Sequence, residues 1–92
     1  MQFIIYCRDK ANALNLRMAT RPAHLAFIEA TPLPIVLAGP LLNEEGGMCG
    51  SMFIVEADDL AAAQRFSAAD PYRKAGLFER VDIHGFRTVV SR

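Results

Sequence analysis

Residues 35–56, IVLAGPLLNEEGGMCGSMFIVE, predict two strands joined by a turn, and this hairpin decides how the rest of the chain is arranged. The apolar run from Ile35 to Leu42 favours a strand. Gly39-Pro40 within it indicates a bulge or an edge position, because proline donates no backbone hydrogen bond. The polar residues 43–47 predict the turn, and Gly50 to Glu56 predict the returning strand.

On the N-terminal side of the hairpin, the pattern predicts a strand followed by a helical region. Residues 3–8, FIIYCR, alternate in a way typical of a strand, with apolar side chains on both faces. The helical region runs from about Ala11 to Ala30. We expect it to have two parts, because Pro22 in a helix interior removes a backbone hydrogen bond. Thr20 then serves as the N-cap of the second part, with Pro22 in its first turn.

On the C-terminal side, the sequence predicts a second helix. Asp58 or Asp59 is expected to cap it, and it continues to about Ala68 with Leu60 and Phe66 turned inward.

A short helical turn and a last strand complete the chain. Asp70-Pro71-Tyr72 opens the turn and Gly76 closes it, since aspartate and proline favour helix starts and glycine favours helix ends. Residues 78–90 then predict a long final strand that is bent near Gly85.

The resulting order, β-α-β-β-α-β, predicts a ferredoxin-like α+β fold. In this fold two helices cover one face of a four-stranded antiparallel sheet. A chain of 92 residues is expected to form a single domain over residues 1–92. Because residues 3–8 are apolar on both sides, we expect the open sheet face to be buried against a second copy, which gives a homodimer.

The composition excludes several classes of protein. Hydrophobic residues make up 52% of the chain and charged residues 22%, which is typical of a globular protein. Ten basic residues balance ten acidic ones, so neither nucleic acid nor an anionic membrane surface is an expected partner. No apolar stretch approaches the roughly 20 residues that span a bilayer, and no signal peptide is evident, so we expect a cytoplasmic protein.

Cysteine and histidine are both sparse in this sequence. Cys7 and Cys49 are expected to be free thiols in a reducing compartment. Buried cysteine usually behaves as a small hydrophobe, so neither thiol is favoured as a nucleophile. His24 and His84 lie far apart in the sequence and lack Cys or Glu at ligand spacing, so no metal site is expected.

Of the two histidines, His24 is the better candidate for a catalytic role. It lies in the helical region among apolar residues, and its spacing from Arg17, Arg21 and Ile28 would place all four on one helical stripe. One interpretation is a core histidine with one satisfied nitrogen. The other is a general base whose pKa lies close to neutrality.

Asp70 also has two interpretations. As a helix cap its carboxylate accepts backbone N–H groups. As the partner of a histidine it would fix the ring's tautomer and stabilise the imidazolium. A carboxylate has two oxygens, so the two roles are compatible.

Three further polar residues are candidate ligand contacts. They are Asp9 at the end of the first strand, Ser51 in the third strand and Tyr72 after the Asp-Pro pair. Each also has a structural interpretation, as a cap, a strand residue and a core aromatic respectively. His84 in the last strand is expected to be structural or to lie at an interface.

Several segments together resemble the YCII-related family. The first is Arg17 followed by Arg21-Pro22-Ala23-His24-Leu25-Ala26-Phe27, and the next are Ala38-Gly39-Pro40-Leu41 and Gly50-Ser51. The segment from Asp70 to Phe78 is similar to that family's DPY-x-x-AGL signature. These matches keep their order over nearly the whole chain. In one departure, His84-Gly85-Phe86 stands where relatives often have a proline before the Phe.

The resemblance implies ferredoxin-like subunits in a dimeric α/β barrel-type assembly, with a His–Asp dyad in a cleft. Carried over by motif, the dyad is His24 and Asp70. The family's characterised enzyme type is a dehydrochlorinase acting on a chlorinated hydroxyhydroquinone. By this resemblance His24 removes a phenolic proton without any cofactor, Arg17 faces the developing phenolate, and Asp9, Ser51 or Tyr72 contact other ring hydroxyls of a small aromatic substrate.

Two alternatives stay open at this point. The first is another cofactor-free isomerase or lyase on the same fold. The second is a non-catalytic protein that binds a small molecule, because fold does not fix function.

Overall fold

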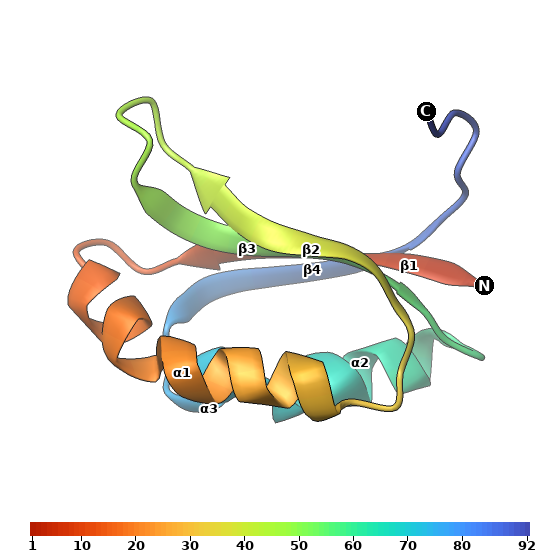
Figure 1. The fold of residues 1–92 in the computed structure, drawn as a ribbon, viewed down its shortest axis with the longest axis horizontal. Coiled ribbons are helices and arrows are strands. Elements are labelled where there is room, and N and C mark those ends of the chain that lie inside the picture. Colours follow the sequence, from red (N-terminus) through yellow and green to blue (C-terminus); the bar gives the residue numbers. More distant parts are fainter.

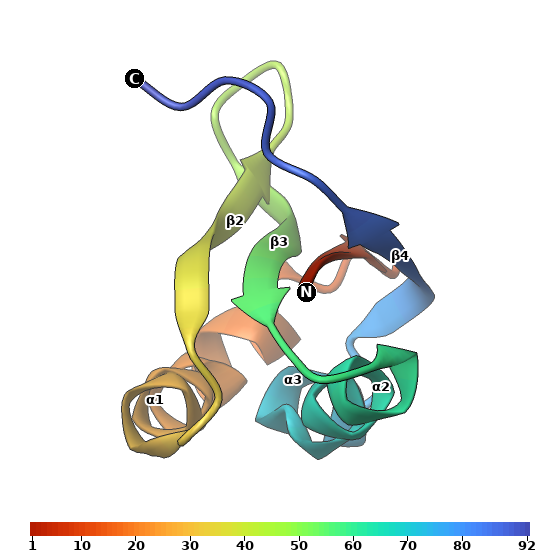
Figure 2. The same ribbon diagram turned by 90° about the vertical axis from the view of Figure 1, so that its right-hand side faces the viewer.

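Four antiparallel strands in the order β2-β3-β1-β4 form one sheet, with three helices on one of its faces (Figure 1). The computed structural model describes all 92 residues. The elements are, in chain order, β1 (Gln2–Asp9), α1 (Leu14–Ala30), β2 (Ile35–Leu42), β3 (Met48–Glu56), α2 (Leu60–Ala69), α3 (Pro71–Lys74) and β4 (Phe78–Phe86). This is the ferredoxin-like β-α-β-β-α-β arrangement, so the predicted fold class is confirmed. The helix α1 lies under β2 and β3, α2 lies under β1 and β4, and α3 lies between the two long helices (Figure 2).

The strand register decides which side chains face the helices. Cys7 pairs with Ser51, and Ile5 pairs with Phe53. Directly paired residues share a face of a sheet, and all four side chains are buried. The central strands therefore direct Ser51 and Phe53 toward the helical layer, where the site described below is formed.

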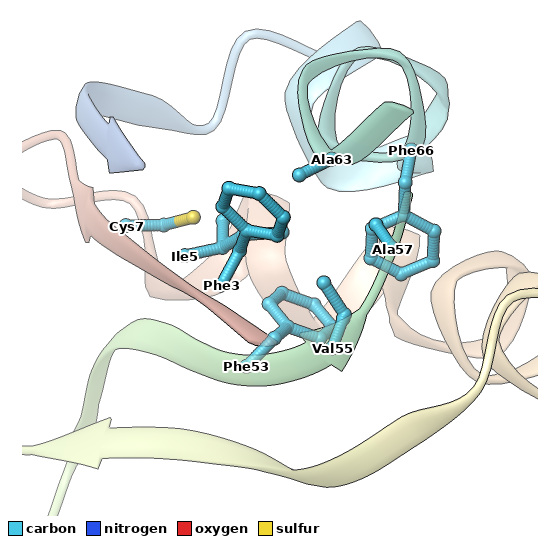
Figure 3. Close-up of a cluster of buried hydrophobic side chains, with 8 residues drawn as sticks. All are labelled: Phe3, Ile5, Cys7, Phe53, Val55, Ala57, Ala63 and Phe66. Carbon is cyan, nitrogen blue, oxygen red and sulfur yellow. The ribbon is translucent and has the colours of Figure 1, made fainter. Parts of the chain in front are cut away.

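A cluster of eight buried side chains joins the sheet to α2 (Figure 3). Its members come from β1, β3, α2 and the segment before α2, and they are Phe3, Ile5, Cys7, Phe53, Val55, Ala57, Ala63 and Phe66. The Phe66 ring packs edge-on against Phe53 and lies 5.2 Å from the Phe27 ring of α1. Both long helices are thus fixed on the same core.

The predicted break at Pro22 is wrong, because α1 is one continuous helix with Pro22 in its interior. Thr20 is accordingly not an N-cap. An interior proline costs about 3 kcal/mol, since it leaves the carbonyl four residues earlier without a partner. That carbonyl belongs to Met18, and both residues lie on the solvent side, where water can satisfy it. The buried residues Arg17 and His24 anchor the helix on either side of the proline.

Two other local predictions differ from the structure. The last strand ends at Phe86 instead of Val90, because Phe86 pairs with the first residue of β1 and the residues after it have no partner strand. Leu60 is 43% exposed at the start of α2, whereas Phe66 is buried as predicted. A residue in the first turn of a helix projects beyond the sheet that the rest of the helix covers.

The edge position predicted for Gly39-Pro40 is confirmed, since β2 is an outer strand of the sheet. The irregularities in its pairing lie elsewhere, between Ile35 and Leu37 and between Leu41 and Leu42.

Helices α2 and α3 both begin at aspartate caps that the sequence predicts. The side chain of Asp59 accepts from the backbone N–H of Ala62 at the start of α2. Asp70 is both the C-cap residue of α2 and the N-cap residue of α3. Gly76 closes the turn with a φ of 77°, which favours glycine. This tight junction holds Asp70 and Tyr72 in place beneath the sheet.

The face of the sheet that points away from the helices is not covered by the chain itself. It carries Ile4, Tyr6, Leu37, Met52 and His84, as the strand pairing shows. His84 is exposed there, opposite Ile4. No helix in the structure is long and apolar enough to span a membrane.

Candidate functional site

His24 and Asp70, which are 46 residues apart in the chain, form a buried hydrogen-bonded pair. The distance between His24 Nδ1 and Asp70 Oδ1 is 2.8 Å. The side chains are 9% and 3% exposed. The helix α1 supplies the histidine on its buried face, and the junction of α2 and α3 supplies the aspartate.

The cap and the pair use the same carboxylate oxygen. Asp70 Oδ1 accepts from the backbone N–H of Tyr72 at 2.9 Å as well as facing the imidazole. Because an ionised carboxylate can only accept, the Nδ1–H group of His24 is the donor of the hydrogen bond to Asp70 Oδ1. The lone pair of the neutral ring is therefore on Nε2.

The Nε2 atom of His24 has no hydrogen-bond partner within the protein. Because no buried side-chain nitrogen or oxygen lacks a partner, Nε2 keeps some accessible surface. His24 is among the residues that line a cavity of about 270 Å³ between α1, β2, β3 and α3. A neutral imidazole that presents its basic nitrogen to a cavity is arranged to accept a proton from a bound molecule.

Tyr72 packs against the face of the imidazole ring. Its ring stacks on that of His24 with centroids 3.9 Å apart and planes 19° apart. The guanidinium of Arg17 also lies over the Tyr72 ring, with its central carbon 4.5 Å from the centroid of that ring. Burial raises the pKa of the Tyr72 hydroxyl more than the positive charges of Arg17 and Arg21 lower it, so the hydroxyl stays protonated at neutral pH.

Arg17 is a fully buried cation that is held by two partners. Its Nε and Nη2 atoms donate to the two carboxylate oxygens of Asp9, at 2.7 and 3.0 Å. Nη2 also donates to Ser51 Oγ at 2.9 Å. Burial lowers the pKa of Arg17, but the hydrogen bond and charge of Asp9 outweigh it and raise that pKa above its ordinary value. The guanidinium is therefore charged and fixed in orientation at the cavity wall.

The cavity combines a polar end with apolar walls. Its twelve lining residues are Arg17, Arg21, His24, Leu25, Ile28, Ala38, Gly39, Pro40, Met48, Ser51, Phe53 and Tyr72. Ligand pockets for drug-sized molecules occupy roughly 300–1,000 Å³. This cavity lies just below that range, so it is suited to a ligand of about one ring. No group of three or more His, Cys, Asp or Glu side chains is arranged to hold a metal ion.

The structure brings all six predicted site residues together, but in two layers. His24, Arg17, Ser51 and Tyr72 line the cavity. Asp9 and Asp70 lie behind the cavity wall. Asp9 binds the guanidinium of Arg17, and Asp70 binds the imidazole of His24. Asp9 was expected to contact a ligand directly and instead binds Arg17.

Sequence reasoning did not select Arg21 or the apolar wall as site residues. The signal for Arg21 and Ile28 was their helical spacing from Arg17 and His24, and the uninterrupted α1 places all four on the cavity. Ala38, Gly39 and Pro40 gave no chemical signal. They enter the site because β2 is paired alongside Ser51 and Phe53 of β3.

Comparison with known proteins gives matches over nearly the whole chain. The YCII-related domain family matches residues 1–87. Protein YciI of Escherichia coli O6:H1 is 39% identical over 97% of this chain and 99% of its own length. An uncharacterized protein of Haemophilus influenzae is 32% identical over the same shares of the two chains.

Among solved structures, a close match is a dehydrochlorinase. The 5-chloro-2-hydroxyhydroquinone dehydrochlorinase of Burkholderia phenoliruptrix AC1100, in complex with 2,5-dihydroxybenzoquinone, has a TM-score of 0.85 and is 34% identical. The match covers 95% of this chain and 94% of the dehydrochlorinase. An antibiotic biosynthesis monooxygenase matches at a TM-score of 0.59 with 14% identity, a likeness in fold alone.

Proposed function

The chain belongs to the YCII-related family, and from this premise we propose that it is a cofactor-independent enzyme whose general base is His24, held by Asp70. The substrate class is a small hydroxylated aromatic compound that binds in the cavity between α1 and the β2–β3 hairpin. The specific reaction that we propose is the elimination of hydrogen chloride from a chlorinated hydroxyhydroquinone.

The observation that carries this proposal is the state of the imidazole. Nδ1 is hydrogen-bonded to Asp70, while Nε2 has no protein partner and keeps accessible surface on a residue that lines the cavity. Proton transfer to Nε2 produces an imidazolium, and the adjacent carboxylate stabilises that cation. A positioned general base contributes typically about 10²–10⁴-fold to rate.

Dehydrochlorination is supported by the 34% identity to a dehydrochlorinase over 95% of this chain. For 5-chloro-2-hydroxyhydroquinone the reaction is redox-neutral and balances without any added reagent. Nε2 of His24 takes the proton of the hydroxyl next to the C–Cl carbon, and that carbon then receives a proton as the ring ketonises. Loss of the proton from the hydroxyl para to the new carbonyl sends an electron pair through the ring. Chloride leaves, and the products are a hydroxybenzoquinone, chloride and one proton.

The polar end of the cavity fits the charge that this reaction develops. When a phenol loses its proton, negative charge appears on oxygen. Arg17 is a fixed cation on the cavity wall, and its orientation by Asp9 and Ser51 requires no rearrangement during the reaction. Preorganised donors of this kind are often the largest contribution to catalysis. Ser51 and Tyr72 supply hydroxyl groups for the other ring oxygens.

We also propose that the active form is a homodimer joined through the open sheet face. Val36, Leu37 and Phe86 are 51%, 47% and 38% exposed on or beside this face, so the chain itself leaves large apolar side chains uncovered there. Light scattering of Tyr6→Glu, which places a charge at the centre of that face, tests the interface. A dimeric wild type and a monomeric, folded variant are the expected outcome.

The decisive experiment offers the protein 5-chloro-2-hydroxyhydroquinone under anaerobic conditions. Chloride is followed with an ion-selective electrode and the quinone by its absorbance. We expect turnover by the wild type and a loss of about 10²–10⁴-fold in His24→Gln, which keeps the side chain polar but removes the base. Arg65→Gln is the control, because Arg65 is exposed on α2, away from both the cavity and the open face of the sheet.

Each contrary result points to a different function. Full turnover by His24→Gln would refute the role of the histidine. Saturable binding of the aromatic compound without chloride release would favour a binding protein. Proton exchange into the bound ring without chloride loss would favour another cofactor-free isomerase or lyase.

A further inference from the structure

The charges around the cavity are not evenly distributed between its lining and its second layer. The lining contains the guanidinium groups of Arg17 and Arg21 and the imidazole of His24, and it contains no carboxylate. The two aspartates of the site lie behind the wall. Asp9 is bound to Arg17 and Asp70 to His24, so each of these carboxylates already has a partner in the protein.

Arg21 is the cation of this site that has no carboxylate partner. The ion pairs of the structure involve the N-terminus, Arg17, His24 and Arg80, and Arg21 takes part in none of them. Arg21 is also exposed, so its guanidinium is free to move toward a ligand at the cavity mouth. An arginine without a carboxylate partner beside a concave site is suited to bind an oxyanion through two parallel hydrogen bonds.

The position of Arg21 on α1 places it between the other two functional side chains of that helix. It follows Arg17 by four residues and precedes His24 by three, and residues at these spacings are neighbours on a helix surface, about 5–6 Å apart at Cβ. Its positive charge acts on a group that lines the cavity: it lowers the pKa of the Tyr72 hydroxyl, although burial raises that pKa by more. A single-ring ligand with one edge at His24 therefore has another edge within reach of Arg21.

The apolar walls restrict the shape of such a ligand. The apolar lining includes Leu25 and Ile28 of α1, Pro40 and Met48 of the β2–β3 hairpin, and Phe53 of β3. A cavity of about 270 Å³ with these walls accommodates a flat, compact body and offers few polar partners along its sides.

We propose that Arg21 is the specificity residue of this site and that it selects ligands that are small planar oxyanions, with phenolate or enolate oxygen, over neutral molecules of the same shape. The inference rests on the proposed function, because it concerns the same cavity. It adds that the oxygen on which the substrate's negative charge rests lies at Arg21, at another edge of the ring than the hydroxyl whose proton His24 removes.

Equilibrium binding of two single-ring probes tests the proposal. The anionic probe is 2,5-dihydroxybenzoquinone, which as a vinylogous acid is ionised at neutral pH. The neutral probe is hydroquinone, kept anaerobic. Both are titrated calorimetrically into the wild type, Arg21→Gln, Arg21→Lys and Arg65→Gln. The last variant is the matched control, because it removes an exposed positive charge on α2 that does not line the cavity.

For Arg21→Gln we expect the Kd of the anionic probe to rise at least about tenfold, the factor for one lost charge-assisted hydrogen bond, and that of hydroquinone to stay unchanged. Arg21→Lys retains part of the affinity, and Arg65→Gln retains all of it. Affinity of the wild type for the anion falls with added salt, and Arg21→Gln loses most of that dependence.

Equal changes for both probes, or no change for either, would overturn the inference about Arg21 while leaving the His24 mechanism intact. A wild type that binds neither probe and releases no chloride would instead overturn the proposed function itself. A defect of Arg21→Gln in kcat alone, with unchanged affinity for the anion, would also refute a role in selection.

Discussion

The substitution Asp70→Asn separates the two roles that one carboxylate has in this structure. Asp70 Oδ1 caps α3 by accepting from the Tyr72 N–H, and the same oxygen receives the Nδ1–H of His24. Asparagine is as good an N-cap residue as aspartate, and its carbonyl oxygen can accept both hydrogen bonds. What the variant loses is the negative charge.

The size of the expected effect follows from the geometry. At the 2.8 Å separation of Nδ1 and Oδ1, a full imidazolium–carboxylate interaction is worth about 6 kcal/mol at an effective dielectric constant of roughly 20. The neutral amide keeps a hydrogen bond and so recovers part of this. A net loss of about 3–5 kcal/mol in transition-state stabilisation remains, which lowers kcat/KM roughly 10²–10⁴-fold.

Chloride release from 5-chloro-2-hydroxyhydroquinone measures the activity, and thermal unfolding followed by circular dichroism measures stability. We expect Asp70→Asn to lose activity with a nearly unchanged Tm. Asp70→Ala is the comparison, since it removes the cap as well, which costs about 1 kcal/mol, and leaves the buried Nδ1–H without a partner, which costs about 1–3 kcal/mol more. For a chain of this size each 1 kcal/mol lowers Tm by roughly 4–8 °C.

Retention of wild-type kcat/KM by folded Asp70→Asn would refute the reasoning, because the charge would then contribute nothing to proton transfer. A large fall in Tm for this variant would show that the amide has turned its nitrogen toward the ring. The cap is lost in that arrangement, and the loss of activity would no longer report the charge alone.

Three other predictions concern the residues around the pair. Tyr72→Phe keeps the stacked ring, so we expect kcat to change less than in Tyr72→Leu, and equal losses in steady-state assays would show that the hydroxyl is what matters. Asp9→Asn leaves Arg17 a buried charge without its carboxylate and should destabilise the fold by about 3–5 kcal/mol in urea unfolding. Asp82→Asn, which breaks the surface ion pair with Arg80, should lower the free energy of unfolding by under about 1 kcal/mol. Similar losses of stability for Asp9→Asn and Asp82→Asn would contradict the role of burial. Burial raises the pKa of Cys7 from 9.0 to about 12, so the unfolded chain releases its thiol proton first and the free energy of unfolding falls as pH rises above 9. Cys7→Ala should lessen that fall, and an identical pH profile for variant and wild type would refute it.

The continuity of α1 has a direct consequence for the site. A break at Pro22 would rotate Arg17 away from the face that carries His24. The uninterrupted helix instead places Arg17, Arg21 and His24 along one cavity. Local propensity disfavours this arrangement, and two buried side chains that bond to other elements override it.

Local patterns in the sequence determined most of the secondary structure. The alternation in β1, the apolar runs of β2 and β3, and the Asp-Pro and Gly signals around α3 act over a few residues, so they can be recognised without knowing the fold. The order of these elements then allows few topologies, and the observed sheet is the one expected from it. The family motifs identified His24 and Asp70 as partners, although neither residue alone favoured chemistry over structure.

Only the tertiary structure decided how these residues meet. The 2.8 Å contact between His24 and Asp70 depends on the packing of α1 against α3, which no local pattern encodes. Tertiary contacts also place Asp9 behind the wall, where it binds Arg17, and Arg21 among the residues that line the cavity. Leu60 is exposed because the first turn of α2 projects beyond the sheet. The last strand ends where its neighbour begins, because a strand persists only while a partner satisfies its hydrogen bonds. The sequence alone thus determined the elements and the candidate residues, whereas long-range contacts determined which charged side chains are buried together at one site.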